Sequence, residues 1–304
     1  MTATAIGNTY LTLLDYAKRE TPGGGIDEII EVLAASNPII ADANVMEGNL
    51  PTGHRSTQRT TQPTGAWRLL NYGVAPSKST TKQVDDTCGI LEAYSKLDVD
   101  VASLGGNEAA FRASEDNAFI AGLNSTAATA IFYGNVKLNP EQMHGLAPRY
   151  NSLATTHEYA DQIIDGKGAG TDNTSIWIIT WGPQTCSLIY PKGSKAGLVS
   201  EDLGKQLVTD SGGTGLYTAW VTKFQWKLGL CLRDYRYVIR IANIDDSNLT
   251  ASGATGADLM DLILDGYYAR PTVDLGIWQR PSSTATRLLP SSYTSRHRTS
   301  PMSI

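Results

Sequence analysis

The segment from Gly48 to Val84 constrains the fold more than any other part of the chain. It contains five basic side chains and not one Asp or Glu, and it lies between Glu47 and the pair Asp85-Asp86. Thr, Ser, Gln, Gly and Pro surround a short aromatic stretch, so the segment has too little apolar surface to form a core alone. This segment, the basic module, must therefore lie on another surface. Its basic residues are Arg55, Arg59, Arg68, Lys78 and Lys82.

The charge of the remaining chain is of the opposite sign except at its end. Residues 1–47 carry two basic and seven acidic side chains, residues 85–279 carry 14 basic and 23 acidic ones, and residues 280–304 carry four basic and no acidic ones. A basic module on an acidic body favours contact between identical copies, because module and body attract each other across a subunit boundary. The alternative is a mobile basic loop that contacts nucleic acid. Against it, the module lacks the dense Lys/Arg clusters of polyanion-binding segments.

Composition places the chain among ordinary globular proteins. Its 304 residues are 41% hydrophobic and 18% charged, enough for one large or two modest domains. Neither a targeting segment nor an apolar run of about 18 residues is visible, so we expect neither export nor a membrane partner. Cys88, Cys186 and Cys231 are far apart and odd in number. They indicate a reducing compartment and free thiols in the core, without the spacing of a zinc site.

Helical periodicity predicts two short N-terminal helices, over 8–19 and 27–36, and one longer helix. Asn107 is the expected N-cap of the longer helix, which is predicted to run to Leu123, continue over 125–133 and stop at Gly134. One of its faces is expected to be buried and holds Phe111, Ala118, Phe119 and Gly122. Its other side has a net negative charge, is expected to be solvated or partnered, and holds Glu108, Arg112, Glu115 and Asp116.

Extended patterns dominate the second half of the chain. Residues 176–181 and 186–190 are predicted to be strands, the first of them buried on both faces. From Thr218 to Leu232 apolar and polar side chains alternate over 15 residues, roughly 50 Å of strand, which suits an architecture that reaches across a surface. Residues 235–241 are expected to extend this ladder, and residues 256–264 to form a helix. Residues 89–101 fit either a strand or a helix.

Catalytic patterns are weak. His54, His144, His157 and His297 are predicted to be surface or structural residues, because none has a second ligand at metal-binding spacing. The glycines of 166–170 lack the spacing of a phosphate loop, and 245–248 lack the ligand spacing of a calcium loop. We therefore predict no cofactor, no metal and no enzymatic activity. The glycine loop and His157 leave a soluble α/β enzyme as a distant alternative.

Several segments, in order along residues 5–265, resemble the major capsid proteins of tailed bacteriophages with the HK97-like fold. An ordered series of this kind is more specific than any single motif. The resembling segments are Arg59–Asn71, Pro76–Thr81, Ala110–Arg112 with Glu115-Asp116, Phe132–Asn135, Gly145–Arg149, Trp181–Pro183, Tyr190–Leu198, Glu201–Gly204 and Arg233–Val238 with Ile244-Asp245.

The resemblance implies an α+β fold and a shell function. The expected parts are an N-terminal arm (1–47), an extended loop (48–84), a peripheral domain with a spine helix (85–150), and an axial domain with long returning strands (151–265). The predicted contacts between subunits join the loop's cations and its anchors Trp67 and Tyr72 to the acidic face with Glu108, Glu115 and Asp116. Apolar anchors give strength, whereas exposed charge pairs set register.

The same resemblance implies assembly partners. Identical subunits would form hexamers and pentamers of an icosahedral virion capsid, assembled in the host cytoplasm around double-stranded DNA on the inner surface. A separate scaffolding protein, a portal and a decoration protein are further expected partners. An encapsulin-like compartment shell shares the fold and is the alternative function. Some relatives lock their shells with an isopeptide bond between a loop lysine and an asparagine. Lys78 and Lys82 lie in the loop of this chain, but no signature of a partner asparagine or an assisting carboxylate is visible.

The last part of the chain, 266–304, departs from the resemblance. Residues 280–287 can be the shifted-frame translation of DNA encoding Ser-Phe-Ile-Tyr-Cys-Asn-Gln, which approximates the strand expected in relatives. A frameshift near residues 265–280 and a natural basic tail both remain open.

Overall fold

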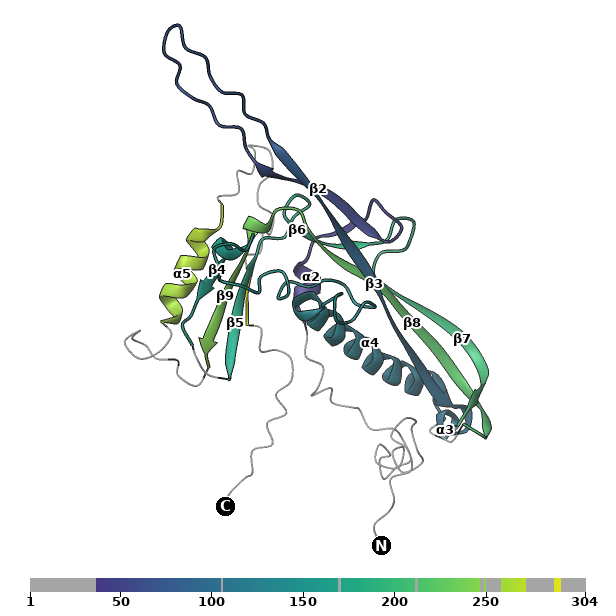
Figure 1. Cartoon of the computed structure of the whole chain (residues 1–304). Helices are drawn as coiled ribbons and strands as arrows, with labels where there is room; N and C mark the ends of the chain where they lie inside the picture. The colour runs from purple at the N-terminus through teal and green to yellow at the C-terminus, as the bar shows by residue number, and fades with distance from the viewer. Residues whose placement is uncertain are drawn as a thin grey trace, which may run out of the picture. The chain divides into compact units, whose positions relative to one another are not determined.

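The computed structural model describes residues 37–104, 106–168, 171–210, 213–246, 249 and 258–271, and the backbone of 287–290. The helices expected over 8–19 and 27–36, His297 and most of the divergent tail lie outside these residues. Helices and two sheets make an α+β fold (Figure 1). The chain divides into two compact units, one with residues 90–128 and 197–227 and the other with 39–89, 129–196 and 228 onward. The domain limits expected from the sequence follow a different division and stay predictions.

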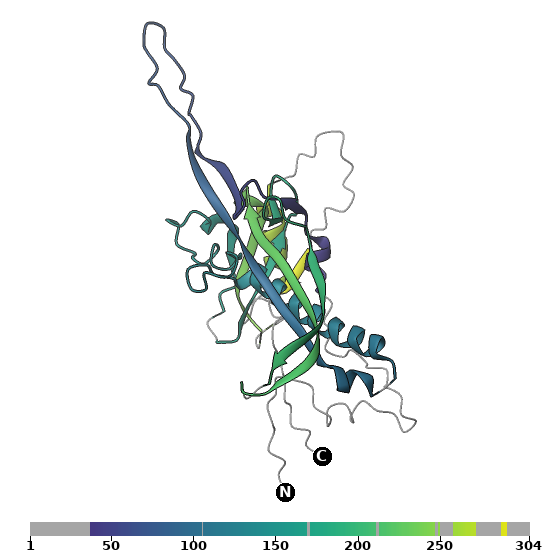
Figure 2. The same ribbon diagram turned by 90° about the vertical axis from the view of Figure 1, so that its right-hand side faces the viewer.

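The larger sheet has the strand order β1-β6-β8-β3-β2, and β7 also pairs with β8. Its longest strands are β3 and β8 (Figure 2). The 17 residues of β8 confirm the long strand expected up to Leu232. The 19 residues of β3 end at Asp98, so most of 89–101, which fitted either a strand or a helix, is strand. Asp98 then caps a short helix, α3 (Val99–Ser103), by accepting a hydrogen bond from Asp100 N at 2.9 Å. The strands are β1 (Val45–Glu47), β2 (Gly53–Thr61), β3 (Thr80–Asp98), β6 (Cys186–Tyr190), β7 (Leu198–Thr209) and β8 (Leu216–Leu232).

The smaller sheet belongs to the second unit and has the order β10-β5-β9-β4. Its strands are β4 (Ile163–Asp165), β5 (Asn173–Ile179), β9 (Val238–Asp245) and β10 (Arg287–Pro290). A helix, α5 (Leu259–Ala269), covers it through Leu259, Leu262 and Ile263, which pack on a core of four isoleucines. These core residues are Ile178, Ile239, Ile241 and Ile244. The capping residue of α5 is Asp258, so the helix begins and ends later than the expected 256–264.

The expectation that 235–241 extends the long ladder is wrong. Tyr235–Tyr237 form a 3-10 turn, η2, and the following strand β9 belongs to the smaller sheet. The reason is local, because the Asp234 carboxylate accepts hydrogen bonds from the backbone N–H and the guanidinium of Arg236 and so turns the chain.

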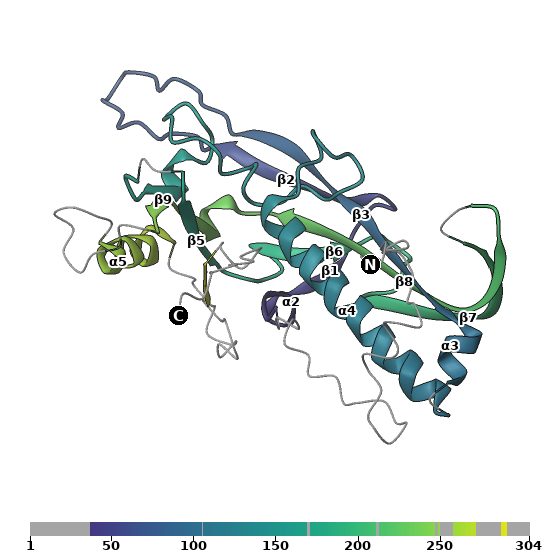
Figure 3. The same ribbon diagram turned by 90° about the horizontal axis from the view of Figure 1, so that it is seen from below.

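The long helix, α4, spans Glu108–Tyr133 as one continuous element (Figure 3). Asn107 caps it as expected, since its Oδ1 accepts a hydrogen bond from Ala110 N at 3.2 Å. The buried face differs from the expected one, because Ala118 and Gly122 are exposed. Burial instead recurs every fourth residue, at Phe111, Leu123, Ala127 and Ile131, while half-buried Phe119 stacks on Phe224.

Two short elements complete the description, α2 (Ile39–Asp42) and the 3-10 turn η1 (Ala160–Gln162). Among the described residues, the helices are too short or too polar to cross a lipid bilayer. All three cysteines are free thiols, with Cys186 and Cys231 buried and Cys88 half-buried.

Candidate assembly surface

The basic module forms a two-stranded root and an irregular tip. Strands β2 and β3 pair antiparallel from Gly53 opposite Thr87 to Arg59 opposite Thr81. We call these paired strands, residues 53–61 and 80–87, the loop root. Residues 62–79, the loop tip, contain no helix or strand and extend beyond the paired strands (Figures 1 and 2). The tip reverses direction where Tyr72 N donates to Leu69 O at 3.2 Å.

Large apolar side chains on the loop tip are exposed to solvent, because no other described residues pack over them. Trp67 is 104% exposed, Leu70 83%, Leu69 74% and Tyr72 70%. The expectation that the module cannot form its own core is therefore confirmed. A cluster of exposed apolar side chains on a soluble chain is typical of an interaction site.

The five basic residues of the module fall into two groups. Arg55 binds Asp85 through two hydrogen bonds of 2.6 and 2.7 Å, and Lys82 Nζ lies 2.9 Å from Glu158 Oε2. The Arg55 guanidinium lowers the pKa of the Asp85 carboxyl. Within the described residues, the other three have no carboxylate partner: Arg59, Arg68 and Lys78.

A buried ion pair anchors the loop root. Arg149 NH2 donates to Asp86 Oδ1 at 2.7 Å, and the side chains are only 7% and 1% exposed. The same guanidinium donates to the carbonyls of His144, Gly145 and Leu230, while Asp86 Oδ2 accepts from Leu232 N at 3.2 Å. Strand β3 is thereby tied to β8 and to the segment that follows α4. This pair fixes the position from which the loop extends.

Sequence reasoning missed this pair. In the sequence, Asp86 only borders the basic module, and Arg149 only ends one of the resembling segments. The available signal was an arginine inside an otherwise apolar stretch, Gly145–Arg149, which requires a carboxylate when it is buried.

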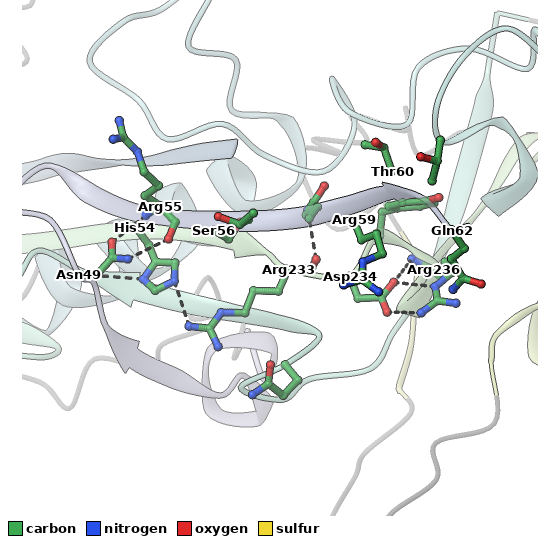
Figure 4. A pocket seen from close by; sticks show the side chains of 15 residues that line it. Asn49, His54, Arg55, Ser56, Arg59, Thr60, Gln62, Arg233, Asp234 and Arg236 are labelled. Carbon is green, nitrogen blue, oxygen red and sulfur yellow. Dashed lines mark hydrogen bonds and ion pairs between the residues drawn. The ribbon is translucent and has the colours of Figure 1, made fainter. Parts of the chain in front are cut away.

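Hydrogen bonds to β2 complete the root (Figure 4). Arg233 NH2 donates to His54 Nε2 at 2.9 Å, and Gln58 Nε2 donates to the carbonyls of Leu232 and Arg233 at 2.9 and 3.1 Å. Burial and the Arg233 charge lower the pKa of His54. The Asn49 side chain bonds the N–H and the C=O of Arg55, which satisfies the strand's outer edge at that point. His54 is therefore a structural residue, as predicted.

The acidic side of α4 contacts strands of its own unit through Arg112 and Asp116. Glu108, Glu115 and Asp116 are half-buried, and Asp116 Oδ2 accepts a hydrogen bond from the Thr222 hydroxyl at 3.3 Å. On the same side Arg112 pairs with Asp202 at 2.8 Å and stacks over the Trp220 ring at 4.4 Å. That the three carboxylates receive a neighbour's cations stays a prediction, and Asp116 already binds Thr222 of β8.

The other polar candidates have structural surroundings. His157 Nδ1 accepts from Tyr159 N, and burial together with Arg149 lowers the pKa of His144. Gly168 is a close-packing position, because an added Cβ would lie 2.5 Å from Asn243 O. Within the residues that the structure describes, no group of three or more His, Cys, Asp or Glu side chains could hold a metal ion.

Comparison with known proteins gives a consistent assignment. The family model of major capsid protein GP7 matches residues 21–287. The solved structure of bacteriophage Epsilon15 matches with 36% sequence identity and a TM-score of 0.69, over 90% of this chain and 81% of that chain.

More distant structural matches fall below a TM-score of 0.5. The Microbacterium phage Oxtober96 structure has 10% identity and a TM-score of 0.47, over 76% of this chain and 98% of that one. The SrpI encapsulin of Synechococcus elongatus has 8% identity and a TM-score of 0.46, over 80% and 99%. A search of curated proteins found no match.

These findings confirm the expected function as a phage shell protein, in place of the encapsulin alternative. The chain belongs to the GP7 family of major capsid proteins, has the HK97-like fold and forms capsomers in the icosahedral head of a bacteriophage.

Proposed function

We propose that the loop tip of one subunit docks on a neighbouring subunit and supplies the main apolar contact of that interface. The observation that carries this proposal is the full exposure of Trp67, with Leu69, Leu70 and Tyr72 beside it, on a segment without a core of its own. Aromatic anchors of this kind dominate the binding energy of most interfaces.

Tip and root have different tasks in this proposal. The buried Asp86–Arg149 pair holds the root in one direction, so the tip is presented with less loss of freedom on docking. An aromatic side chain buries 150–250 Å² when covered, which corresponds to about 4–6 kcal/mol before the cost of ordering is subtracted. A net contribution of about 2 kcal/mol from Trp67 is therefore reasonable, and it is repeated at every subunit of the shell.

Charge sets the register of the contact. Arg59, Arg68 and Lys78 have no carboxylate partner within the described residues, and we propose that acidic groups of the neighbour face them. Arg55 and Lys82 already have partners in their own chain, so they contribute less. Glu108, Glu115 and Asp116 are half-buried, so they are candidate acceptors only through the exposed parts of their side chains.

The remaining parts of the shell assignment are also proposals. The predicted N-terminal arm, peripheral domain and axial domain would arrange the subunits as hexamers and pentamers. We propose assembly in the host cytoplasm with a separate scaffolding protein and a portal, a decoration protein as a further partner, and packaged DNA on the inner surface. We infer a structural protein without catalytic activity, supported by the capsid family and by the structural surroundings of its histidines.

A double substitution tests the docking proposal. Trp67→Ala with Tyr72→Ala should abolish or greatly reduce closed particles in electron micrographs and leave subunits or small oligomers in size-exclusion chromatography. The unfolding midpoint of the unassembled subunit should not change, because both side chains are exposed there. The matched control is Thr64→Ala, a polar position on the same tip. A normal yield of particles from the double variant would refute the proposal.

A further inference from the structure

A pocket of about 820 Å³ lies beside β2 at the loop root (Figure 4). One wall is β2 itself, from His54 to Gln62, and the opposite wall is the turn from Arg233 to Arg236, with Asn49 and Gln184 at the margins. All of these residues belong to the second unit.

The pocket is strongly basic. Four arginines and one aspartate line it: Arg55, Arg59, Arg233, Arg236 and Asp234. Arg55 and Arg236 are each held by a carboxylate, Asp85 and Asp234 respectively. Among the described residues, the Arg233 guanidinium binds only neutral groups, the carbonyl of Pro183 and the ring of His54. Arg59 is exposed, and its guanidinium has no hydrogen-bond partner among the described residues. Two guanidinium groups thus share the pocket without a counter-ion from the described chain.

The wall of the pocket is also incomplete in its hydrogen bonds. Ser56 is 8% exposed, and its hydroxyl has no partner in the described chain. The same is true of Gln58 Oε1, whose amide nitrogen is already bound to the carbonyls of β8 and the following turn. Buried polar atoms without a partner are rare, and each one requires an explanation. Both atoms are covered by the protein itself, so the feature that an occupant of the pocket would satisfy is the uncompensated charge of Arg59 and Arg233.

We propose that this pocket receives an Asp or Glu side chain from a second copy of the chain. A carboxylate matches the fork of a guanidinium and forms hydrogen bonds about twice as strong as neutral ones. The second copy is the fitting source because residues 85–279 are acidic and the family assembles from identical subunits. This inference rests on the proposed contact between neighbouring subunits and adds Arg59 and Arg233 as its acceptor site.

Zero-length crosslinking of assembled, DNA-free particles tests the pocket. Arg59→Lys keeps the charge and introduces an amine that carbodiimide couples to a carboxylate in contact with it. Particles are assembled from a mixture of ¹⁴N- and ¹⁵N-labelled subunits and analysed by mass spectrometry. We expect a crosslink from position 59 to an Asp or Glu peptide of the other isotope. The control variant is Lys137→Arg, which keeps Arg59. Carbodiimide does not couple arginine, so no crosslink from residue 59 should form in this variant. Crosslinks only within one isotope, or only to Asp234, would overturn the proposal.

A measurement on the unaltered protein covers the case in which the variant does not assemble. Phenylglyoxal modifies accessible arginines, and its reaction with Arg59 should be about tenfold slower in DNA-free particles than in dissociated subunits, as expected for a site whose occupancy is worth about 1.4 kcal/mol. Equal rates would contradict the pocket even where particles form normally. Protection that appears only in DNA-filled particles would show a phosphate occupant and would also overturn the proposal. The tip variants test a different proposal. Normal assembly of the Trp67→Ala, Tyr72→Ala variant would refute docking of the loop tip, whereas the reactivity of Arg59 tests the pocket alone.

Discussion

Asp86→Asn removes the charge from the buried ion pair while it keeps the size of the side chain. In the native subunit this carboxylate faces the Arg149 guanidinium at 2.7 Å, and neither side chain is more than 7% exposed. The other acceptors of Arg149 are three neutral backbone carbonyls. The substitution therefore leaves a buried cation without a negatively charged partner. Loss of one partner from such a pair costs about 3–5 kcal/mol. We therefore expect the free energy of unfolding to fall by about this amount.

The preceding residue offers a matched control. Asp85 is also an aspartate on β3 and also binds an arginine, but both members of the Arg55–Asp85 pair are about half exposed. Because water screens this pair, Asp85→Asn should shift the unfolding midpoint little. Urea titration of unassembled subunits, followed by tryptophan fluorescence, measures both variants. Equal small shifts for Asp85→Asn and Asp86→Asn would refute the role assigned to the buried pair.

Two further predictions concern the subunit alone. The pKa of His54 in the folded subunit is lowered from 6.5, so the unfolded chain binds a proton at a higher pH than the folded one. The free energy of unfolding should therefore fall as the pH drops below about 6.5. His54→Gln should make this pH dependence weaker in urea titrations. Equal slopes would contradict the assignment. Gly229→Ala should destabilise the subunit by about 1–3 kcal/mol, because a Cβ there would lie 2.9 Å from Cys88 Sγ and Thr87 O. Gly122→Ala, in open space on α4, should stabilise it by about 0.5–1 kcal/mol in the same assay, and a reversed order would count against the packing described.

Local patterns predicted the elements whose signals are contained in their own residues. The alternation in β8, the Asn107 cap and the long helix that follows it are of this kind, and all three are present. The turn at Tyr235–Tyr237 was missed because its cause is local: Arg236 donates hydrogen bonds to the Asp234 carboxylate, and these override the alternation of apolar residues. The buried face of α4 was predicted only in part: Phe111 is buried, but Ala118 and Gly122 are exposed, and burial continues at Leu123, Ala127 and Ile131.

The candidate site likewise has features that local sequence predicts and contacts that only the fold reveals. Charge counting located the basic module, and its aromatic residues are exposed as a segment without a core requires. Counting could not show that Arg55 and Lys82 pair within the chain, since Glu158 is distant in sequence from Lys82. Nor could it show that Asp86 and Arg149 meet, or that Arg59 and Arg233 line one pocket. These contacts depend on which strands are neighbours, and that information is absent from any single segment.

A cryo-electron microscopy map of the assembled shell tests the central claim most directly. We expect the side chains of Trp67 and Tyr72, which are exposed in the single subunit, to be covered by atoms of a neighbouring subunit. A loop tip that faces solvent in the assembled shell, or that folds back onto its own subunit, would contradict it.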